Sequence, residues 1–308
     1  MKFSVIIPVY NKANVICEAI KSVYAQTMKE YEIIIVDDGS HDGLVEVLES
    51  MESPCLRVIH QKNRGVSVAR NVGIENARGD FICFLDADDL WKANHLEVLS
   101  ELIEKYKQAK VFITSHEITT PNGKVFHSSE ELGGFEEEFK TEDLIGLLNT
   151  TSYSILHTNS MCVKKKLFIE DNIKFEEGIT VGEDSDVWYR LGLKNDVIFT
   201  KKETTVYRRE YSTATRNTFH VQDWIFSLRI NDILCDQYVS DKVKKSVIEL
   251  IDRYKMTSSR EYMLANNRKE AKKILGEVKN KRGRRYILTF VFLCLPYAFC
   301  EKILRKKY

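Results

Sequence analysis

The chain has 308 residues, of which 44% are hydrophobic and 30% are charged, and its formal net charge is +1. This balance excludes a disordered chain and fits one large domain with a smaller appendage. A net charge so close to zero gives no electrostatic support for nucleic-acid binding. The seven cysteines form no CxxC pair, which indicates a reducing cytosol, and the N-terminal apolar run is too short for a signal peptide.

Short apolar runs alternate with segments of helical periodicity over the first third of the chain. The runs predict strands at residues 3–9, 31–36, 56–60, 81–85 and 111–115. Such alternation is typical of right-handed βαβ units, so we predict an α/β fold with a mostly parallel central sheet flanked by helices.

The pattern becomes irregular from residue 116 onward. The sequence PNG at residues 121–123 predicts a hairpin turn, and residues 130–138 are rich in glutamate. Helical periodicity returns at about residue 241 and continues to about residue 279. We therefore expect a C-terminal helical appendage.

Carboxylates follow two of the predicted strands. Asp37 and Asp38 follow the second strand, and Asp86, Asp88 and Asp89 follow the apolar run FICFL. In open α/β sheets ligands bind at this C-terminal edge, and like charges crowded there repel one another unless a cation or another partner holds them. The alternative is a solvated acidic turn that caps the next helix.

Two common glycine-rich phosphate-binding motifs are missing from the sequence. The first turn has no GxGxxG, and the sequence contains no GxxxxGK[ST], so a bound diphosphate would need a divalent cation held by carboxylates. A haloacid-dehalogenase-like phosphatase or a receiver domain would require acidic residues after the first strand. The chain has PVYN at that position, which disfavours both.

The segments SVIIPVYN, IIIVDDGSHDG, NRGVSVARNVGI, FICFLDADD and VGEDSDVWYRL occur in this order. Together they resemble the inverting glycosyltransferases of family 2, which have the GT-A nucleotide-sugar fold. The likeness covers roughly residues 3–210. It implies a GT-A domain at residues 1–215, with a nucleotide-binding half at 1–115 and an acceptor-side half at 116–215. A helical extension at 216–280 and a basic, apolar tail at 281–308 would follow.

The resemblance implies nucleotide contacts for several residues. Pro8 and Tyr10 would line the base, Tyr10 by stacking, and Asp38 would accept the imide N–H of uracil. Asn63 and Arg70 would lie close to the nucleotide, with Arg70 as a fixed cation. The alternative for Arg70 is an ordinary surface arginine on a helix.

The sequence DAD at residues 86–88 resembles the metal-binding pair of the family. Asp88 would ligate Mg²⁺ or Mn²⁺, and Asp86 would bind the metal through a water molecule or contact the ribose. The cation would offset the charge that builds on the departing nucleotide diphosphate. Asp89 is expected to start the next helix.

The sequence GEDSDVW at residues 182–188 resembles the segment that carries the catalytic base. Inversion by a single displacement needs a base that takes the acceptor's proton, and the resemblance assigns this role to Asp184. The alternative is an ordinary acidic first turn of a helix. Further along, Arg208 would approach the diphosphate, whereas Glu210 and Tyr211 stand where the family often has a histidine.

The C-terminal tail combines apolar and basic residues. Between Arg285 and Glu301 lie fifteen uncharged residues, which are too few to cross a hydrocarbon core of roughly 30 Å. The basic flanks predict an anchor at the headgroup level of an anionic bilayer. A terminal helix that docks on the protein core is the alternative.

These observations predict a metal-dependent hexosyltransferase that adds single sugars, because the QxxRW signature of processive relatives is absent. By resemblance, the donor would be a UDP-sugar and the acceptor a lipid-linked or other oligosaccharide. The setting would be surface polysaccharide synthesis at the cytoplasmic face of a bacterial membrane. A catalytically silent nucleotide-sugar-binding or scaffolding protein of the same fold is the alternative.

Overall fold

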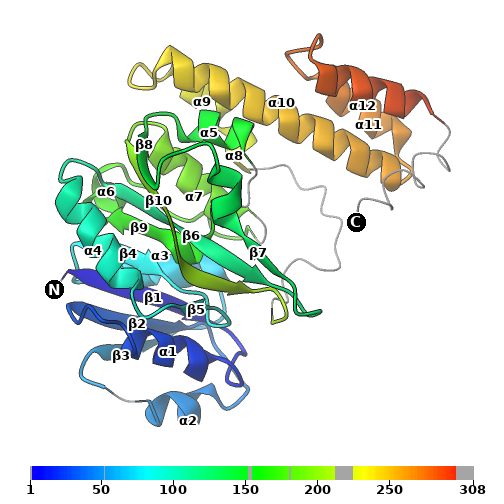
Figure 1. Cartoon of the computed structure of the whole chain (residues 1–308). Helices are drawn as coiled ribbons and strands as arrows, with labels where there is room; N and C mark the ends of the chain where they lie inside the picture. The colour runs from blue at the N-terminus through cyan, green and yellow to red at the C-terminus, as the bar shows by residue number, and fades with distance from the viewer. Residues whose placement is uncertain (1, 52, 152–154, 180–181, 212–224, 296–308) are drawn as a thin grey trace. The chain divides into compact units, whose positions relative to one another are not determined.

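The computed structural model describes residues 2–51, 53–151, 155–179, 182–211 and 225–295 (Figure 1). The chain forms two compact units, residues 1–216 and residues 217–308.

The N-terminal unit is built on a single sheet. Within the described residues its ten strands are β1 (Phe3–Val9), β2 (Tyr31–Asp37), β3 (Leu56–His60), β4 (Phe81–Phe84), β5 (Leu90–Trp91), β6 (Val111–Thr119), β7 (Val125–His127), β8 (Glu138–Thr141), β9 (Met161–Lys164) and β10 (Val197–Arg208). Their order is β3-β2-β1-β4-β9-β6-β10-β5, and β7 pairs with β6 while β8 pairs with β10. The first four strands in this order run parallel, as predicted.

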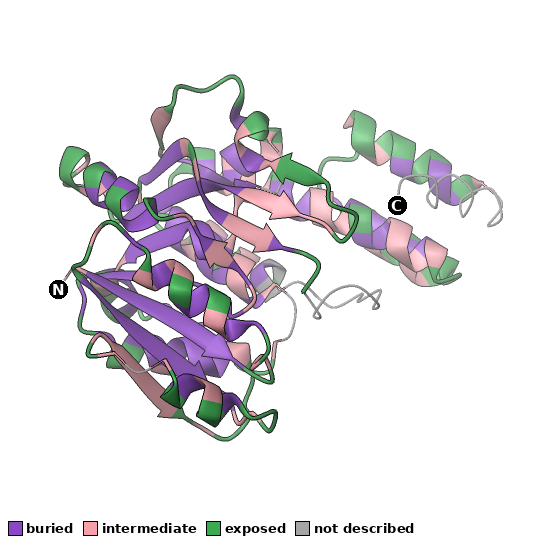
Figure 2. Cartoon of the chain, turned by 60° about the horizontal axis from the view of Figure 1, so that its bottom comes forward, coloured by how far each residue is buried: buried purple, intermediate pink, exposed green. Residues whose placement is uncertain are grey.

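Helices flank the parallel part of the sheet. They are α1 (Ile16–Tyr24), α2 (Leu44–Glu49), α3 (Val66–Asn76) and α4 (His95–Lys105). Every residue of β1 and β2 is buried, as Figure 2 shows in purple, because a parallel sheet is covered on both faces. Phe3, Val5 and Ile7 face the core that contains α1, α2 and α4. On the opposite face, α3 approaches so closely that a Cβ at Gly73 would lie 2.4 Å from the Ile6 side chain.

The second half of the N-terminal unit departs from simple βαβ order. Three strands that the sequence did not predict, β8, β9 and β10, enter the sheet here, and β9 is antiparallel to both β4 and β6. Strand β9 has only four residues, and β10 contains the charged run Lys201, Lys202 and Glu203, so neither reads as an apolar strand. The hairpin predicted at PNG is confirmed, because β6 pairs antiparallel with β7 and Gly123 has φ 75°.

The remaining helices of this unit lie in its second half. They are η1 (Ser128–Leu132), α5 (Leu144–Thr150), η3 (Thr158–Ser160), α6 (Lys165–Glu170) and α7 (Glu183–Gly192).

The C-terminal unit is helical in its described part, as predicted. Its helices are α8 (Ile225–Leu228), α9 (Ile230–Cys235), α10 (Asp241–Leu264), α11 (Arg268–Gly276) and α12 (Arg284–Cys294). The Ser240 hydroxyl accepts a hydrogen bond from Val243 N and thereby caps α10. None of the helices in the described ranges is both long and apolar enough to cross a membrane.

Candidate active site

The turns that follow β1, β2 and β4 meet at one edge of the sheet. Asp38 N donates to Val9 O (2.9 Å), and Leu85 N donates to Ile6 O (3.0 Å). The turn after β1 is also tied to the turn after β2, because Asn11 N donates to the Ser40 hydroxyl at 2.9 Å. The edge predicted to carry the ligand site is therefore a connected surface of loops.

Asp38 organises the loop between β3 and α3. Its buried carboxylate accepts hydrogen bonds from Gln61 Nε2 (2.7 Å), Arg64 N (2.9 Å) and Gly65 N (2.8 Å). A carboxylate offers about four acceptor positions, so these bonds leave one for a ligand. Asp38 thus holds the loop between β3 and α3 in shape, a role that the sequence did not predict.

The other residues predicted to line the base or to lie close to the nucleotide differ in exposure. Pro8 is buried within β1, opposite Val36 of β2, whereas Tyr10 is 46% exposed and Asn63 is exposed. Gly39 lets the Asn63 loop approach the β2 turn, because its φ is +77° and a Cβ there would lie 3.0 Å from Asn63 N. Tyr10 and Asn63 therefore have surface available to a ligand, whereas Pro8 is buried.

Arg70 joins the two halves of the N-terminal unit. It is only 4% exposed, so the alternative of a surface arginine is wrong. Its guanidinium donates to Asp86 Oδ1 and to Glu183 Oε1, each at 3.0 Å, and lies 5.3 Å from the Phe175 ring centroid. Burial lowers the pKa of Arg70, but the charges of Asp86, Glu183 and Asp184 raise it overall, so the residue is a permanent cation.

Asp184 lies in the first turn of α7, beside Glu183. Its carboxylate accepts from Thr158 Oγ1 (3.0 Å) and from Ser185 N (2.6 Å). Burial and the neighbouring Asp184 charge raise the pKa of Glu183, while Arg70 opposes that shift. Glu183 is thus engaged by a buried cation, and Asp184 is the half-buried carboxylate beside it.

Asp86 and Asp88 have carboxylates with capacity for further ligands. Asp86 Oδ1 accepts from Arg70, and Asp88 Oδ2 accepts from Lys12 Nζ at 2.8 Å. Within the described ranges, the second oxygen of each carboxylate accepts no hydrogen bond. Such a pair of partly exposed hard oxygen donors at a strand end fits Mg²⁺ or Mn²⁺.

Lys12 lies at this site, although the sequence motifs did not predict a role for it. Its ammonium bridges Asp88 and the main-chain oxygen of Tyr211, which it meets at 2.8 Å. Its position directly after PVYN is the only sequence signal that could have drawn attention to it.

The expectation that Asp89 starts a helix is wrong. Asp89 is 1% exposed, and its carboxylate accepts from Arg208 N (2.7 Å) and from Asn159 Nδ2. Burial and the nearby Asp86 charge raise the pKa of Asp89. Helix α4 begins only at His95, because β5 intervenes.

Asn159 holds the DAD turn from the second half of the unit. Fully buried, it accepts from Asp86 N at 2.9 Å, donates to Asp89, and offers its main-chain oxygen to Trp91 Nε1 at 3.0 Å. Nothing in the sequence TNS suggested this role.

Arg208 lies against the backbone of the same turn. Its Nε donates to Asp88 O at 2.6 Å, another nitrogen pairs with Glu18, and its guanidinium lies 4.6 Å from the Tyr211 ring centroid. Its Nη2 is buried and has no partner among the described residues. Arg208 thus contacts the main chain of the DAD turn and pairs with Glu18, and its approach to the diphosphate stays a prediction.

His157 is a further residue at this site that the sequence did not reveal. Its ring lies against the Tyr207 ring, tilted by 34°, with a centroid distance of 4.3 Å. Burial lowers the pKa of His157, and the charges of Asp86 and Asp184 oppose that shift.

A second group of potential metal ligands lies on β6, β7 and β10. Ligand atoms of Glu117, His127 and Glu203 all lie within 4.8 Å of one another. Their charges are already compensated, because His127 Nδ1 lies 2.8 Å from Glu203 Oε2 and Lys92 Nζ donates to Glu117 Oε1 at 2.5 Å. None of the predicted donor-binding residues belongs to this group.

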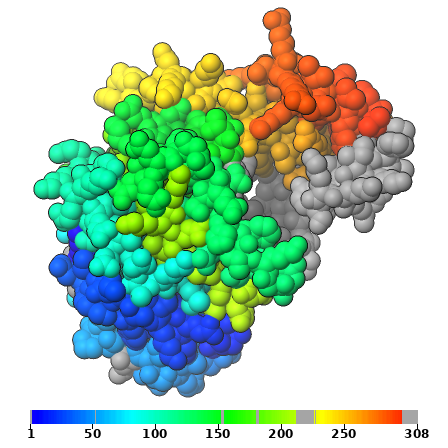
Figure 3. Space-filling model, in the orientation of Figure 1, coloured from blue at the N-terminus to red at the C-terminus, as the bar shows by residue number. Residues whose placement is uncertain are grey.

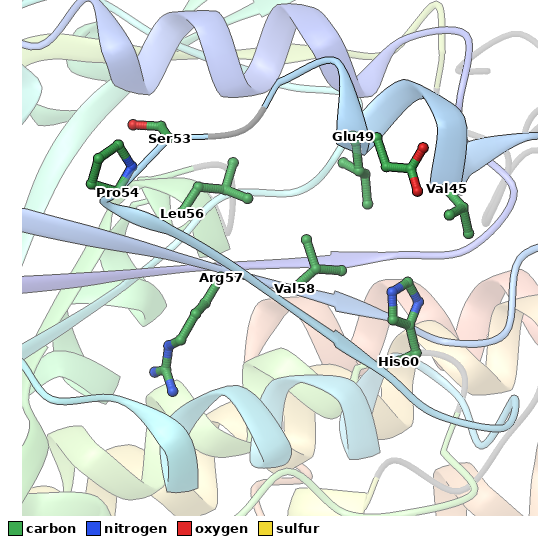
Figure 4. Close-up of a pocket in the computed structure, with 9 residues that line it drawn as sticks. Val45, Glu49, Ser53, Pro54, Leu56, Arg57, Val58 and His60 are labelled. Atoms are coloured by element: carbon green, nitrogen blue, oxygen red, sulfur yellow. The ribbon is translucent and has the colours of Figure 1, made fainter.

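A surface pocket of about 680 Å³ lies between α2 and the edge strand β3 (Figure 4). Val45, Leu56 and Val58 contribute apolar walls, and Glu49 and His60 lie at one end. The motif carboxylates do not line it, so the pocket is separate from the site described above.

Comparison with known proteins decides the family. A family model described as glycosyl transferase family 2 matches residues 4–167. This chain belongs to glycosyltransferase family 2. An uncharacterized glycosyltransferase of Rickettsia conorii is 34% identical over 70% of this chain, which spans 34% of that relative's length. Glycosyltransferase GlyG of Streptococcus pneumoniae is 28% identical over 90% of this family 2 chain and 94% of its own.

Solved structures confirm the GT-A fold predicted for this family 2 chain. Staphylococcus aureus TarS 1–349 in complex with UDP-GlcNAc matches with a TM-score of 0.69 and 19% identity, over 100% of this chain and 92% of TarS 1–349. The mannosyltransferase PcManGT of Pyrobaculum calidifontis, in complex with GDP-Man and Mn²⁺, matches with a TM-score of 0.57 and 15% identity. That match covers 98% of this chain and 83% of PcManGT.

Proposed function

We propose that this chain is an inverting, metal-dependent glycosyltransferase that moves one sugar from a UDP-sugar to an acceptor hydroxyl. The observation that carries the proposal is the Arg70 bridge, which joins Asp86 of the DAD turn to Glu183 at the start of α7. This bridge brings the proposed donor-binding carboxylates and the proposed base Asp184 to one edge of the sheet. A single displacement requires that proximity.

The proposed donor site uses the loops after β1, β2 and β3. Tyr10 offers an exposed ring for stacking on the base, and Asp38 retains one acceptor position for a uracil imide. The bound UDP-GlcNAc of TarS supports a uridine donor, whereas PcManGT holds GDP-Man. The acceptor-only chemistry of Asp38 favours uracil, although a guanine imide would present a similar donor.

The proposed diphosphate site lies beside the DAD turn. A divalent cation held by Asp88 and Asp86 would supply charge stabilisation for the departing diphosphate. Arg70 and Lys12 hold those two carboxylates at fixed positions. Arg208 fixes the backbone of the turn and brings a buried, partly unpartnered guanidinium to it.

Asp184 is the proposed general base. Thr158 and Ser185 N orient its carboxylate, which restricts the positions from which it can take a proton. Glu183 is unsuited to this task because Arg70 engages it. The acceptor proton would pass to Asp184 as the acceptor oxygen bonds to the anomeric carbon and the bond to the diphosphate breaks.

We assign the acceptor to the class of lipid-linked or other oligosaccharides at the cytoplasmic face of the membrane, as in surface polysaccharide synthesis. The basic and apolar C-terminal tail supports this location, and the cysteines among the described residues are free thiols, which fits a reducing compartment.

The test is release of UDP from a panel of UDP- and GDP-sugars, with and without Mn²⁺, by the full chain and its variants. We expect metal-dependent turnover with a UDP-sugar, loss of turnover but retained UDP binding in Asp184→Asn, and loss of both metal-dependent binding and turnover in Asp88→Ala. The exposed Asp171→Asn is the matched control and should behave as wild type. UDP binding without turnover by the wild type, with every acceptor class supplied, would instead support a silent binder.

A further inference from the structure

Helix α12 has two faces of different character. Its inner face contributes Phe292 and Leu293 to the core formed with α10 and α11. Thr289, which is fully buried, accepts hydrogen bonds from Arg260 of α10 at 3.0 and 2.6 Å. The alternative of a docked helix therefore holds for this face. Only part of the tail's apolar residues pack into the core of the C-terminal unit.

The outer face of α12 is apolar and exposed. Ile287 is 52% exposed, Leu288 55%, Phe290 53% and Val291 51%. Three of these, residues 287, 288 and 291, follow helical spacing, and Phe290 stacks beside Tyr286 at a centroid distance of 6.4 Å. Figure 3 shows the side chains of α12 in red. Large apolar side chains gathered on one exposed helical face indicate a binding surface.

The approach to this face is basic. The exposed residues Lys279, Lys281, Arg282, Arg284 and Arg285 precede it or begin it, and the chain has no acidic residue between Glu277 and Glu301.

The backbone that carries these cations is held in place. The Asp252 carboxylate of α10 accepts hydrogen bonds from Lys279 N and Asn280 N, both at 2.8 Å. Asp252 is buried, so the turn before α12 is fixed to the core of the C-terminal unit. The basic residues and the apolar face therefore belong to one ordered surface.

We propose that the outer face of α12 binds the headgroup zone of an anionic lipid bilayer. Its 11 residues give a length of about 16 Å at 1.5 Å of rise per residue, so the helix lies along the surface and does not span. Apolar side chains enter the acyl boundary, while the neighbouring guanidinium and ammonium groups meet lipid phosphates. Charge complementarity selects the bilayer over an apolar protein partner, because no carboxylate of this segment balances its cations.

The experiment is co-flotation of the full chain with vesicles of phosphatidylcholine alone or of phosphatidylcholine mixed with phosphatidylglycerol. We expect at least tenfold more binding to the anionic vesicles, reduced by raised salt. The outer-face variant Ile287→Gln/Leu288→Gln/Val291→Gln should lose at least tenfold, and the charge variant Arg282→Gln/Arg284→Gln should lose the preference for phosphatidylglycerol. Residues 296–308 stay unchanged in every variant.

The matched control is Ile169→Gln, which removes an exposed apolar side chain (65% exposed) from α6 and should leave flotation unchanged. Circular dichroism and thermal unfolding check that each variant is folded. Equal flotation of the outer-face variant and wild type, equal binding to both vesicle types, or no flotation of wild type would overturn the proposal. So would a wild-type dimer in sedimentation that becomes monomeric in the outer-face variant without any lipid dependence. UDP-dependent thermal stabilisation, measured in parallel, reports on the donor site separately.

Discussion

The two halves of the N-terminal unit contribute different things to the same site. Residues 1–115 supply the regular parallel strands and the turns that carry Tyr10, Asp38, Asp86 and Asp88. Residues 116–211 supply η3, β10 and α7, which carry the side chains of Asn159, Arg208 and Glu183 that bond to the first half. The repeated strand and helix pattern of the first half can be recognised in the sequence. The role of the second half becomes clear only from its contacts with the first.

The contacts between the halves follow a common rule: a polar group at a turn of the first half is matched by a partner from the second. Arg70 pairs with Glu183, Asp86 N with Asn159, Asp89 with Arg208, and Lys12 with the Tyr211 oxygen. The geometry of the proposed donor site thus depends also on residues outside the motifs, such as Asn159 and Arg208. The following variants test this division of roles, in order of decreasing expected effect.

Asp184→Asn is expected to have the largest effect, because it removes the proposed base from the second half and leaves every turn of the first half in place. General base removal lowers turnover by about 10²–10⁴-fold, measured as the kcat of sugar transfer under saturating Mn²⁺. UDP affinity should stay within about threefold of wild type, since Asp184 makes no contact with the DAD turn among the bonds observed. A kcat unchanged in Asp184→Asn would remove the residue from the chemistry.

Asn159→Ala tests whether the second half holds the DAD turn. The change leaves Asp86 N without its acceptor and the buried Asp89 carboxylate without one donor. Losing two buried hydrogen bonds costs about 2–4 kcal/mol in the free energy of unfolding, measured by urea denaturation, and Mn²⁺-dependent UDP affinity should fall with it. Asn76→Ala on the exposed end of α3 is the control and should cost less than about 1 kcal/mol. Similar losses in both variants would mean that Asn159 has no special role.

The fold of the first half could be predicted because its strands contain runs of apolar residues and its helices carry apolar residues at a regular helical spacing. Strands such as Phe3–Val9 and Leu56–His60 have the bounds that the apolar runs indicated. Strand β10 was missed because Lys201, Lys202 and Glu203 interrupt its apolar pattern at the register shifts in its pairing with β6. Local sequence carries no sign of such irregular pairing.

The contacts of the candidate site could not be predicted from local sequence either. Arg70 and Asp86 drew attention through their motifs, but each also bonds to a residue far away in sequence. The separation is 73 residues between Asp86 N and the Asn159 side chain, and 113 residues between Arg70 and Glu183. Asp89 was misassigned because an acidic residue before a helix is usually a cap. Only the folded chain reveals that it is buried against Arg208.

Replacing His95 is expected to have a smaller effect, on the pH dependence of the free energy of unfolding. This residue joins α4 of the first half to Thr204 of β10 through a 2.7 Å hydrogen bond. Burial lowers the pKa of His95 to about 3, whereas the unfolded chain has a histidine pKa of about 6.5. Between these values the unfolded state binds a proton that the folded state does not. Stability is therefore lost as pH falls, by about 1.4 kcal/mol per pH unit for this one group.

His95→Gln keeps a polar partner for Thr204 but does not titrate. Its unfolding free energy, measured by urea denaturation from pH 6.5 down to pH 4.5, should fall less steeply than that of wild type by about 1 kcal/mol per pH unit. His41→Gln in the exposed turn after β2 is the control and should keep the wild-type slope. A slope unaltered by His95→Gln would show that the histidine is protonated in the folded chain, against its burial.

Lys12→Met is expected to have the smallest effect and tests the lysine that links the halves through Asp88 and the Tyr211 oxygen. The ammonium would compete with a divalent cation for the Asp88 carboxylate, so removing the ammonium should make that carboxylate more receptive to metal. The Mn²⁺ concentration that gives half-maximal UDP binding, followed by calorimetry, should fall by about three- to tenfold, which corresponds to roughly 1 kcal/mol. Lys21→Met, an exposed lysine on α1, should leave it unchanged. A rise in the Mn²⁺ midpoint together with weaker UDP binding would instead place Lys12 on the diphosphate, because an ammonium that contacts phosphate directly assists the metal and does not compete with it.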